Sequence, residues 1–197
     1  MTSCRLNSVL SAIDTINQQD PHQIEENGQL QAKELVYGHQ MSNCLNQYWP
    51  DASELLQIAV RAQHIKRWHL KRHDFDTGKA GYLKWRKELG KFHAELTAAL
   101  MQENGYSPEE ASQTAAIIRK EKFKSNADSQ TMEDVACLVF LQYYFDEFSG
   151  KYSEEKIIDI VQKTWKKMSG QGHKIALSLK LPGHLAELVK KALGSYI

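Results

Sequence analysis

The chain has 197 residues, of which 42% are hydrophobic and 25% charged, values that are ordinary for one globular domain with a sizeable core. A net charge of +1 excludes a strong global field toward nucleic acid or an acidic membrane, so that any such affinity must come from local basic clusters. Only four prolines and eleven glycines occur, which leaves long stretches free to be helical.

The cysteine usage and the hydropathy pattern indicate the cellular compartment in which the protein is expected. Cys4, Cys44 and Cys137 are odd in number and show no CxxC spacing, which suits a reducing compartment. The first residues lack the apolar region of a signal peptide, and no apolar run approaches the roughly 20 residues that span a bilayer. We therefore expect a cytoplasmic protein that makes no membrane contact.

The first third of the chain predicts three helices. Apolar residues at helical spacing indicate helices over 4–18 and 31–49, separated by a polar loop at 22–30. Asp51, with Glu54 three residues later, is the expected N-cap of a third helix. That helix is apolar on most of its sides, which is typical of a central, buried helix.

The middle of the chain predicts a basic loop at 70–80 and a long helix at 80–103. Ser107, followed by a proline at the first helical position and by Glu110 three residues later, marks the start of another helix. We expect that helix to reach about Phe123.

The last third predicts a very apolar helix over 131–148, after a polar turn. Further helices are expected from Ser153, over 175–181 and from Pro182. The sequence shows no convincing strand, no internal repeat and no linker that would indicate a second domain. We therefore predict an all-α protein whose residues 1–197 form a single domain.

Three polar residues stand at notable places in these helices. His39 is a lone histidine, His64 ends the buried helix, and Asp134 lies near the head of the later apolar helix. This order resembles the HD-domain superfamily of helical metal-dependent phosphohydrolases and their relatives. The resemblance implies an HD-domain-like helical bundle at about 30–148, with a C-terminal helical extension at 149–197.

Two longer stretches carry a second resemblance. Ala-Gly-Tyr-Leu-Lys-Trp-Arg at 80–86 and Glu-Asp-Val-Ala-Cys-Leu-Val-Phe at 133–140 are similar to stretches of an uncharacterised family of short, all-helical bacterial and fungal proteins. This second likeness names no activity.

The chain departs from the HD pattern at its centre. The Asp expected directly after the second His is replaced by Ile65, which puts binuclear chemistry in doubt and favours a non-catalytic site. A literal His73-Asp74 pair occurs in the basic loop rather than at the end of a buried helix, so it is the weaker candidate.

The resemblance implies one divalent metal ion, such as zinc, manganese, iron or cobalt. Its expected ligands are His39, His64 and Asp134, with His93 as a fourth because some HD relatives recruit a further histidine. Each has a structural alternative. Asp134 can close a capping box with Thr131, His64 and His93 can be packed histidines, and His39 can face solvent.

Charged residues around these positions complete the predicted site. Glu121 is the candidate general base, and Lys66 stands with it as a candidate catalytic residue. The expected phosphate-binding side chains, whose alternative is a solvated helix surface, are Arg67, Arg72, Lys84, Arg86, Arg119 and Lys120. An aromatic ring beside a cation, as in Arg67-Trp68 and Trp85-Arg86, could stack on a base or sugar.

Two functions follow as expectations. The first is a metal-dependent phosphohydrolase acting on a nucleotide or a related phosphorylated metabolite. The alternative is a non-catalytic HD-like module that binds a nucleotide or RNA through the basic loop 66–72 and the helix at 84–91. A helical adaptor for protein–protein contacts is a third hypothesis, which only the amphipathic character of the helices supports.

Overall fold

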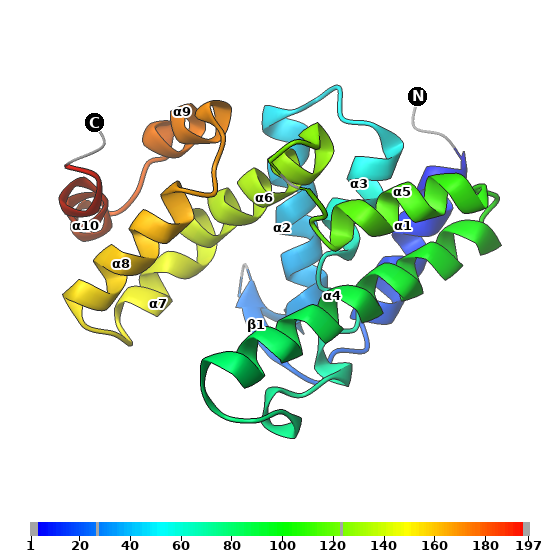
Figure 1. The fold of residues 1–197 in the computed structure, drawn as a ribbon, viewed down its shortest axis with the longest axis horizontal. Helices are drawn as coiled ribbons and strands as arrows, with labels where there is room; N and C mark the ends of the chain where they lie inside the picture. Colours follow the sequence, from blue (N-terminus) through cyan, green and yellow to red (C-terminus); the bar gives the residue numbers. More distant parts are fainter. Residues whose placement is uncertain (1–3, 27, 123, 195–197) are drawn as a thin grey trace. The chain divides into compact units, whose positions relative to one another are not determined.

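The computed structural model describes residues 4–26, 28–122 and 124–194 and is mainly helical (Figure 1). Within these residues one sheet occurs, and it has two short strands. The predicted all-α class is confirmed. No helix in the described part of the chain combines the length and the apolar character needed to cross a membrane.

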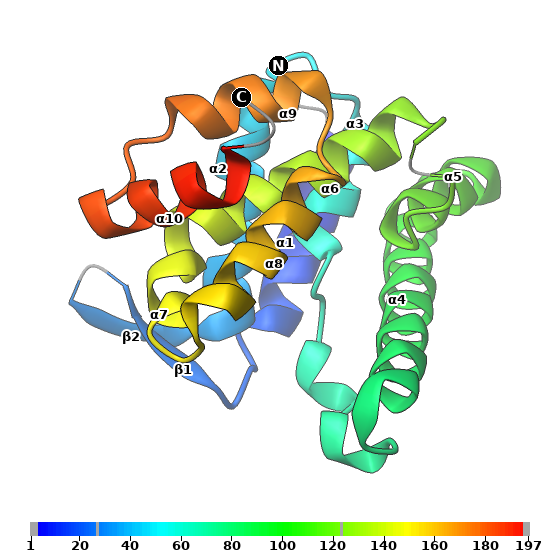
Figure 2. The same cartoon turned by 60° about the vertical axis from the view of Figure 1, so that its left-hand side comes forward.

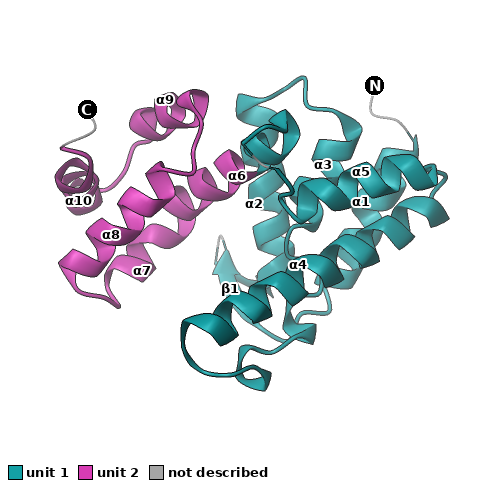
Figure 3. Ribbon diagram, in the orientation of Figure 1, with its two compact units in different colours: residues 1–132 teal, residues 133–197 magenta. Residues whose placement is uncertain are grey.

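The chain divides into two compact units, residues 1–132 and 133–197 (Figure 3). The division falls inside the helix α6 (Ala127–Val139), earlier than the expected end of the core at 148. The elements of the first unit before α6 are α1 (Cys4–Asn17), β1 (Gln23–Glu26), β2 (Gln29–Ala32), α2 (Lys33–Tyr48), α3 (Glu54–Ala62), the short 3-10 segments η1 (Arg67–His69) and η2 (Arg72–Asp74), α4 (Gly78–Glu103) and α5 (Pro108–Ile118).

Helix α3 is the centre of the first unit, as its apolar pattern predicted. It packs against α1, α2, α4 and α5, and Ile58, Ala59 and Val60 are completely buried. Helices α4 and α5 pack along each other, joined by a short turn (Figures 1 and 2). The long side chains of α4 that face away from this core are therefore free to line a surface pocket.

The segment expected as a loop at 22–30 forms most of a β-hairpin, and the prediction of no strand was wrong here. Strands β1 and β2 pair antiparallel, with Gln23 opposite Ala32 and Glu26 opposite Gln29 (Figure 2). Gly28 has φ of +76°, a conformation that glycine adopts without strain. Neither strand buries a full face, so the apolar alternation that identifies a strand in a sequence is missing.

Several helix ends differ from their predictions for local reasons. The N-cap of α3 is Ser53, whose hydroxyl accepts a hydrogen bond from the Leu56 N–H at 3.2 Å, so the predicted cap at Asp51 was wrong. The capping box of Ser107 and Glu110 is confirmed. Helix α5 ends at Ile118, and Phe123, its expected end, lies outside the described residues.

The second unit consists of the rest of α6, a π-helical segment η3 (Phe140–Tyr144), α7 (Phe145–Ser149), α8 (Glu154–Trp165), α9 (Gly170–Ser178) and α10 (Gly183–Leu193). The π-helical segment interrupts what the sequence predicted as one helix. Ser153 caps α8 as expected, whereas α9 begins at 170 rather than 175 because the Ser169 side chain accepts from the Gly172 N–H. Helices α8 and α10 pack together, and each has a buried apolar residue, Ile157 on α8 and Leu185 on α10.

Candidate anion-binding pocket

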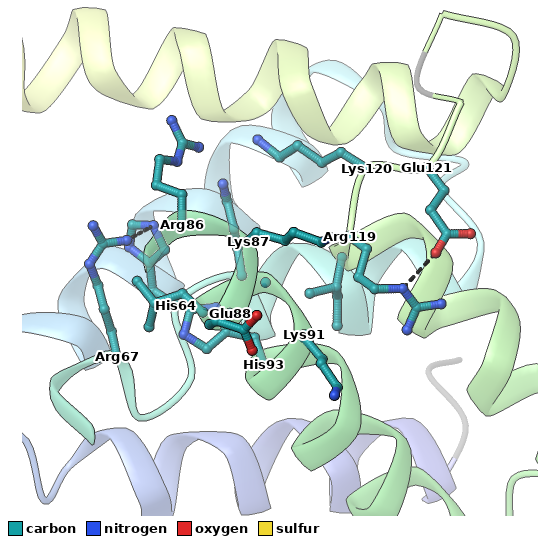
Figure 4. Close-up of a pocket in the computed structure, with 14 residues that line it drawn as sticks. His64, Arg67, Arg86, Lys87, Glu88, Lys91, His93, Arg119, Lys120 and Glu121 are labelled. Carbon is teal, nitrogen blue, oxygen red and sulfur yellow. Dashed lines mark hydrogen bonds and ion pairs between the residues drawn. The ribbon is translucent and has the colours of Figure 1, made fainter. Parts of the chain in front are cut away.

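A pocket of about 400 Å³ opens on the first unit, lined by residues 63–64, Arg67, 86–91, His93 and 118–121 (Figure 4). We call it the anion pocket. Three segments far apart in the sequence meet there: the end of α3 with its following turn, the middle of α4 and the end of α5. Two of its side chains are glutamates, and six are cations: Arg67, Arg86, Lys87, Lys91, Arg119 and Lys120.

Local geometry explains how these cations come to face one pocket. On α4, Lys87 and Lys91 are four residues apart, so their side chains emerge from the same face of the helix. The chain turns sharply after α5, where Lys120 has a φ of 54°. Lys66 has a φ of 51°, which ends the α3 segment and turns the chain toward Arg67.

His64 lies at one end of the anion pocket between an acid and a cation. Its Nδ1 is 3.1 Å from the Glu34 carboxylate, and its Nε2 is 2.8 Å from the Arg67 guanidinium. Because a guanidinium only donates hydrogen bonds, Nε2 accepts and Nδ1 carries the proton, which it donates to Glu34. Burial, followed by the charge of Arg67, holds the pKa of His64 well below its usual value. His64 is therefore a neutral imidazole.

Glu34 is the buried partner of this histidine. Burial raises the pKa of its carboxyl to about 7, and the charge of Arg67, whose Nε lies 3.9 Å away, opposes that rise. The Glu34 backbone N–H donates to the buried Asp20 carboxylate at 3.0 Å, and its carbonyl accepts from Asn17. The same Asn17 accepts from the Lys66 N–H at 2.9 Å, so one polar network joins Glu34 to the backbone two residues after His64.

His93 is the most deeply buried polar group of the pocket, with 3% of its surface exposed. Its Nε2 has no hydrogen-bond partner, and its ring centroid is 6.2 Å from that of His64. Burial, together with the neighbouring His64 and Arg67, lowers the pKa of His93 to about 3, so the ring is neutral. An unpartnered buried nitrogen is costly, and a ligand that donates a hydrogen bond would remove that cost.

Most of the predicted site residues come together in the anion pocket. His64, His93 and Glu121 line it, and so do four of the six predicted phosphate-binding side chains, Arg67, Arg86, Arg119 and Lys120. Glu121, the expected general base, forms an ion pair of 2.6 Å with Arg119.

Five predicted residues do not line the anion pocket: His39, Lys66, Arg72, Lys84 and Asp134. The side chain of His39 is 47% exposed, and its Nε2 is 3.0 Å from the Asp14 carboxylate. Arg72 donates to the carbonyls of Phe75 and Gly78, and neither Lys66 nor Lys84 lines this pocket.

Asp134 has a structural role inside the second unit. Helix α6 begins at Ala127, so Thr131 is an interior helical residue and the predicted capping box was wrong. The Asp134 carboxylate, 1% exposed, accepts from the Ser169 N–H at 2.8 Å and from the Ser169 hydroxyl at 2.5 Å. These bonds tie the start of α9 to α6.

His64 and His93 are the two predicted metal ligands that line the anion pocket. Among the described residues, no group of three or more His, Cys, Asp or Glu side chains is arranged to hold a metal ion. Both ring nitrogens of His64 are occupied, by Glu34 and by the Arg67 cation, which would repel a metal ion. The chemistry that these side chains offer is binding of an anion beside two neutral imidazoles.

Sequence reasoning singled out neither Glu34 nor the two lysines Lys87 and Lys91, which it covered only as part of the range 84–91. Lys87 and Lys91 could have been found from helical spacing, because they follow Arg86 on the long helix that was predicted. Glu34 carries no local signal, since it is an ordinary acidic residue in a first helical turn, 30 positions away from His64.

Fold and site together define a mainly helical protein with a basic pocket, one of whose lining residues, His64, is paired with the buried Glu34. The chain belongs to the family described as domain of unknown function DUF4202, whose family model matches residues 7–189. This match confirms the likeness to an uncharacterised family and gives no evidence of membership in the HD-domain superfamily. No curated protein and no solved structure matches the chain.

Proposed function

We propose that the anion pocket binds the phosphate groups of a nucleotide or of a related phosphorylated metabolite. The observation that carries this proposal is the meeting of six cationic side chains from three separate segments, in a chain whose net charge is only +1. Arginine guanidinium groups offer paired donors that match phosphate oxygens, and lysines add mobile positive charge. The two glutamates leave a clear positive excess in the pocket.

The unpaired Nε2 of the buried His93 favours a ligand that carries more than phosphate and that reaches this atom when the side chains covering it move. A phosphate oxygen that is fully ionised cannot donate to the Nε2 of His93, whereas a sugar hydroxyl or a base amino group can. The other ring nitrogen of the neutral His93 donates to the backbone of Gln63, which leaves Nε2 as an acceptor. A nucleotide supplies both a phosphate for the cations and such a donor.

Calorimetric titration with a panel of nucleoside mono- and triphosphates tests this proposal. We expect Arg86→Ala with Lys87→Ala to weaken the binding about tenfold or more, because both cations are exposed and line the pocket. Lys79→Ala is the matched control, since Lys79 is an exposed lysine of α4 that does not line the pocket. Absence of binding tighter than about 1 mM across the panel would refute the proposal.

The second candidate function is the metal-dependent phosphohydrolase that the HD resemblance implies. The observation that favours it is the unpaired Nε2 of His93 beside the pair of His64 and Glu34. A metal ion could bind the Nε2 of His64 only after the Arg67 guanidinium had moved away from that atom. Metal analysis of protein purified without an affinity tag, with phosphatase assays in manganese and cobalt, tests it. Absence of both stoichiometric metal and activity removes this candidate and leaves binding intact.

A further inference from the structure

A second pocket of about 700 Å³ lies in the first unit, between the start of α2 and the segment that follows α3. We call it the tryptophan pocket. Two indole rings line it, Trp68 and Trp85, together with the cations Lys33, Arg67, Lys71 and Arg72. Glu34 is its one carboxylate among the lining residues. Aromatic rings and positive charges are therefore gathered in the same hollow.

Arg67 joins the two pockets, because its side chain lines both. Its guanidinium lies over the Trp85 ring, 5.2 Å from the centroid, and also contacts the Nε2 of His64 at 2.8 Å. The anion pocket and the tryptophan pocket thus share one lining arginine.

The Trp85 ring of the tryptophan pocket is held in a fixed orientation. The Trp85 indole N–H donates to the Leu70 carbonyl at 2.9 Å, which fixes the ring on the segment between the two 3-10 turns. A ring held in place loses little conformational freedom when a base stacks on it. Lys33 and Lys71 are exposed and stand beside the rings, where they can meet the phosphates that flank a stacked base.

We propose that the chain binds a single-stranded polynucleotide across both pockets, with phosphates in the anion pocket and a base stacked in the tryptophan pocket. Proteins that bind single strands combine a positively charged path for the backbone with aromatic rings for the bases, and both are present here. This inference rests on the proposed function, because it extends the same anion pocket. The two ideas are separable, because the inference requires an oligomer to bind more tightly than a mononucleotide and the proposed function does not.

The test compares a mononucleotide with fluorescent uridine and deoxythymidine oligomers of about 12 nucleotides, by calorimetry and fluorescence anisotropy. We expect an oligomer to bind at least about tenfold more tightly than uridine monophosphate at the same salt concentration. The two oligomers distinguish RNA from DNA, and tighter binding of either one supports the inference.

Variants assign the effect to each pocket. Trp68→Leu and Lys71→Glu should each weaken binding of the oligomer about tenfold and leave binding of uridine monophosphate unchanged. Arg86→Ala should weaken binding of both ligands. Lys71 is exposed, so its variant remains informative if Trp68→Leu does not fold. Trp49→Leu, at a tryptophan that lines neither pocket, is the control.

Three results would overturn the inference. If uridine monophosphate binds and neither oligomer binds more tightly, the polynucleotide is excluded while the proposed function stands. If no ligand binds, both fail. If Trp68→Leu has no effect and a poly-glutamate chain competes as well as the oligomer, the surface recognises acidic proteins instead, because such chains offer no ring to stack.

Discussion

Replacing His93 by glutamine should make the free energy of unfolding less sensitive to acid. Burial lowers the pKa of His93 to about 3 in the folded protein, below the ordinary histidine value of 6.5. Protons therefore bind the unfolded chain more readily than the folded one between those two values. The stability that His93 contributes is present above about pH 6.5 and is lost as the pH falls toward 3.

The size of the effect follows from the same two pKa values. Each pH unit between these two values changes the free energy of unfolding by about 1.4 kcal/mol. At about pH 5 the free energy of unfolding is therefore lower than at neutral pH by about 2 kcal/mol because of His93. Glutamine does not titrate, so this loss should be absent from the variant. The contribution of Glu34 to the pH dependence has the opposite sign, because its raised pKa of about 7 stabilises the folded state at low pH. Glu34 is present in both proteins, so its contribution does not affect the comparison.

Urea unfolding at about pH 5 and about pH 7, in chelator, measures the difference directly. We expect the wild-type protein to lose about 2 kcal/mol more than His93→Gln over this interval. His73→Gln provides the baseline for losing a surface histidine, since the His73 side chain is exposed. An identical pH dependence in the wild type and His93→Gln would refute the assignment of His93 as a buried neutral ring.

Three further substitutions test the structural roles derived above. Asp134→Ala should lower the free energy of urea unfolding by about 3 kcal/mol, because it removes the charged acceptor of two Ser169 hydrogen bonds. Gly172→Ala should lower it by about 2 kcal/mol, because the added Cβ would lie 2.7 Å from the Asp134 carboxylate. Ile65→Asp, which restores the expected HD residue at a completely buried position, should cost on the order of 4 kcal/mol and bring no stoichiometric metal by elemental analysis.

Each of these expectations has a clear contrary result. Asp134→Asn keeps one acceptor oxygen, so a loss as large as that of the alanine variant would argue against the hydrogen bonds as the cause. Gly90→Ala is the control for Gly172→Ala, since an added Cβ at Gly90 meets no atom within 4 Å. An Ile65→Asp protein that stays stable and gains a metal ion would restore the HD-like metal centre as the first hypothesis.

The sequence alone predicted most helices, because apolar spacing and capping are local signals. The long helix expected at 80–103 is α4 (Gly78–Glu103), and the capping box of Ser107 needs only residues three apart. Where a local signal was weak, as in the polar hairpin, prediction failed. The family likeness also came from two short stretches of sequence.

Tertiary structure alone decided what the polar residues do. Asp134 looked like a cap or a metal ligand, yet its carboxylate binds Ser169, 35 positions away. His64 acquires its neutral state from burial and from the charge of Arg67, and the cations of the anion pocket gather only when α3, α4 and α5 pack. Such contacts depend on which helix faces meet, and the periodicity of a single helix carries no information about its partner.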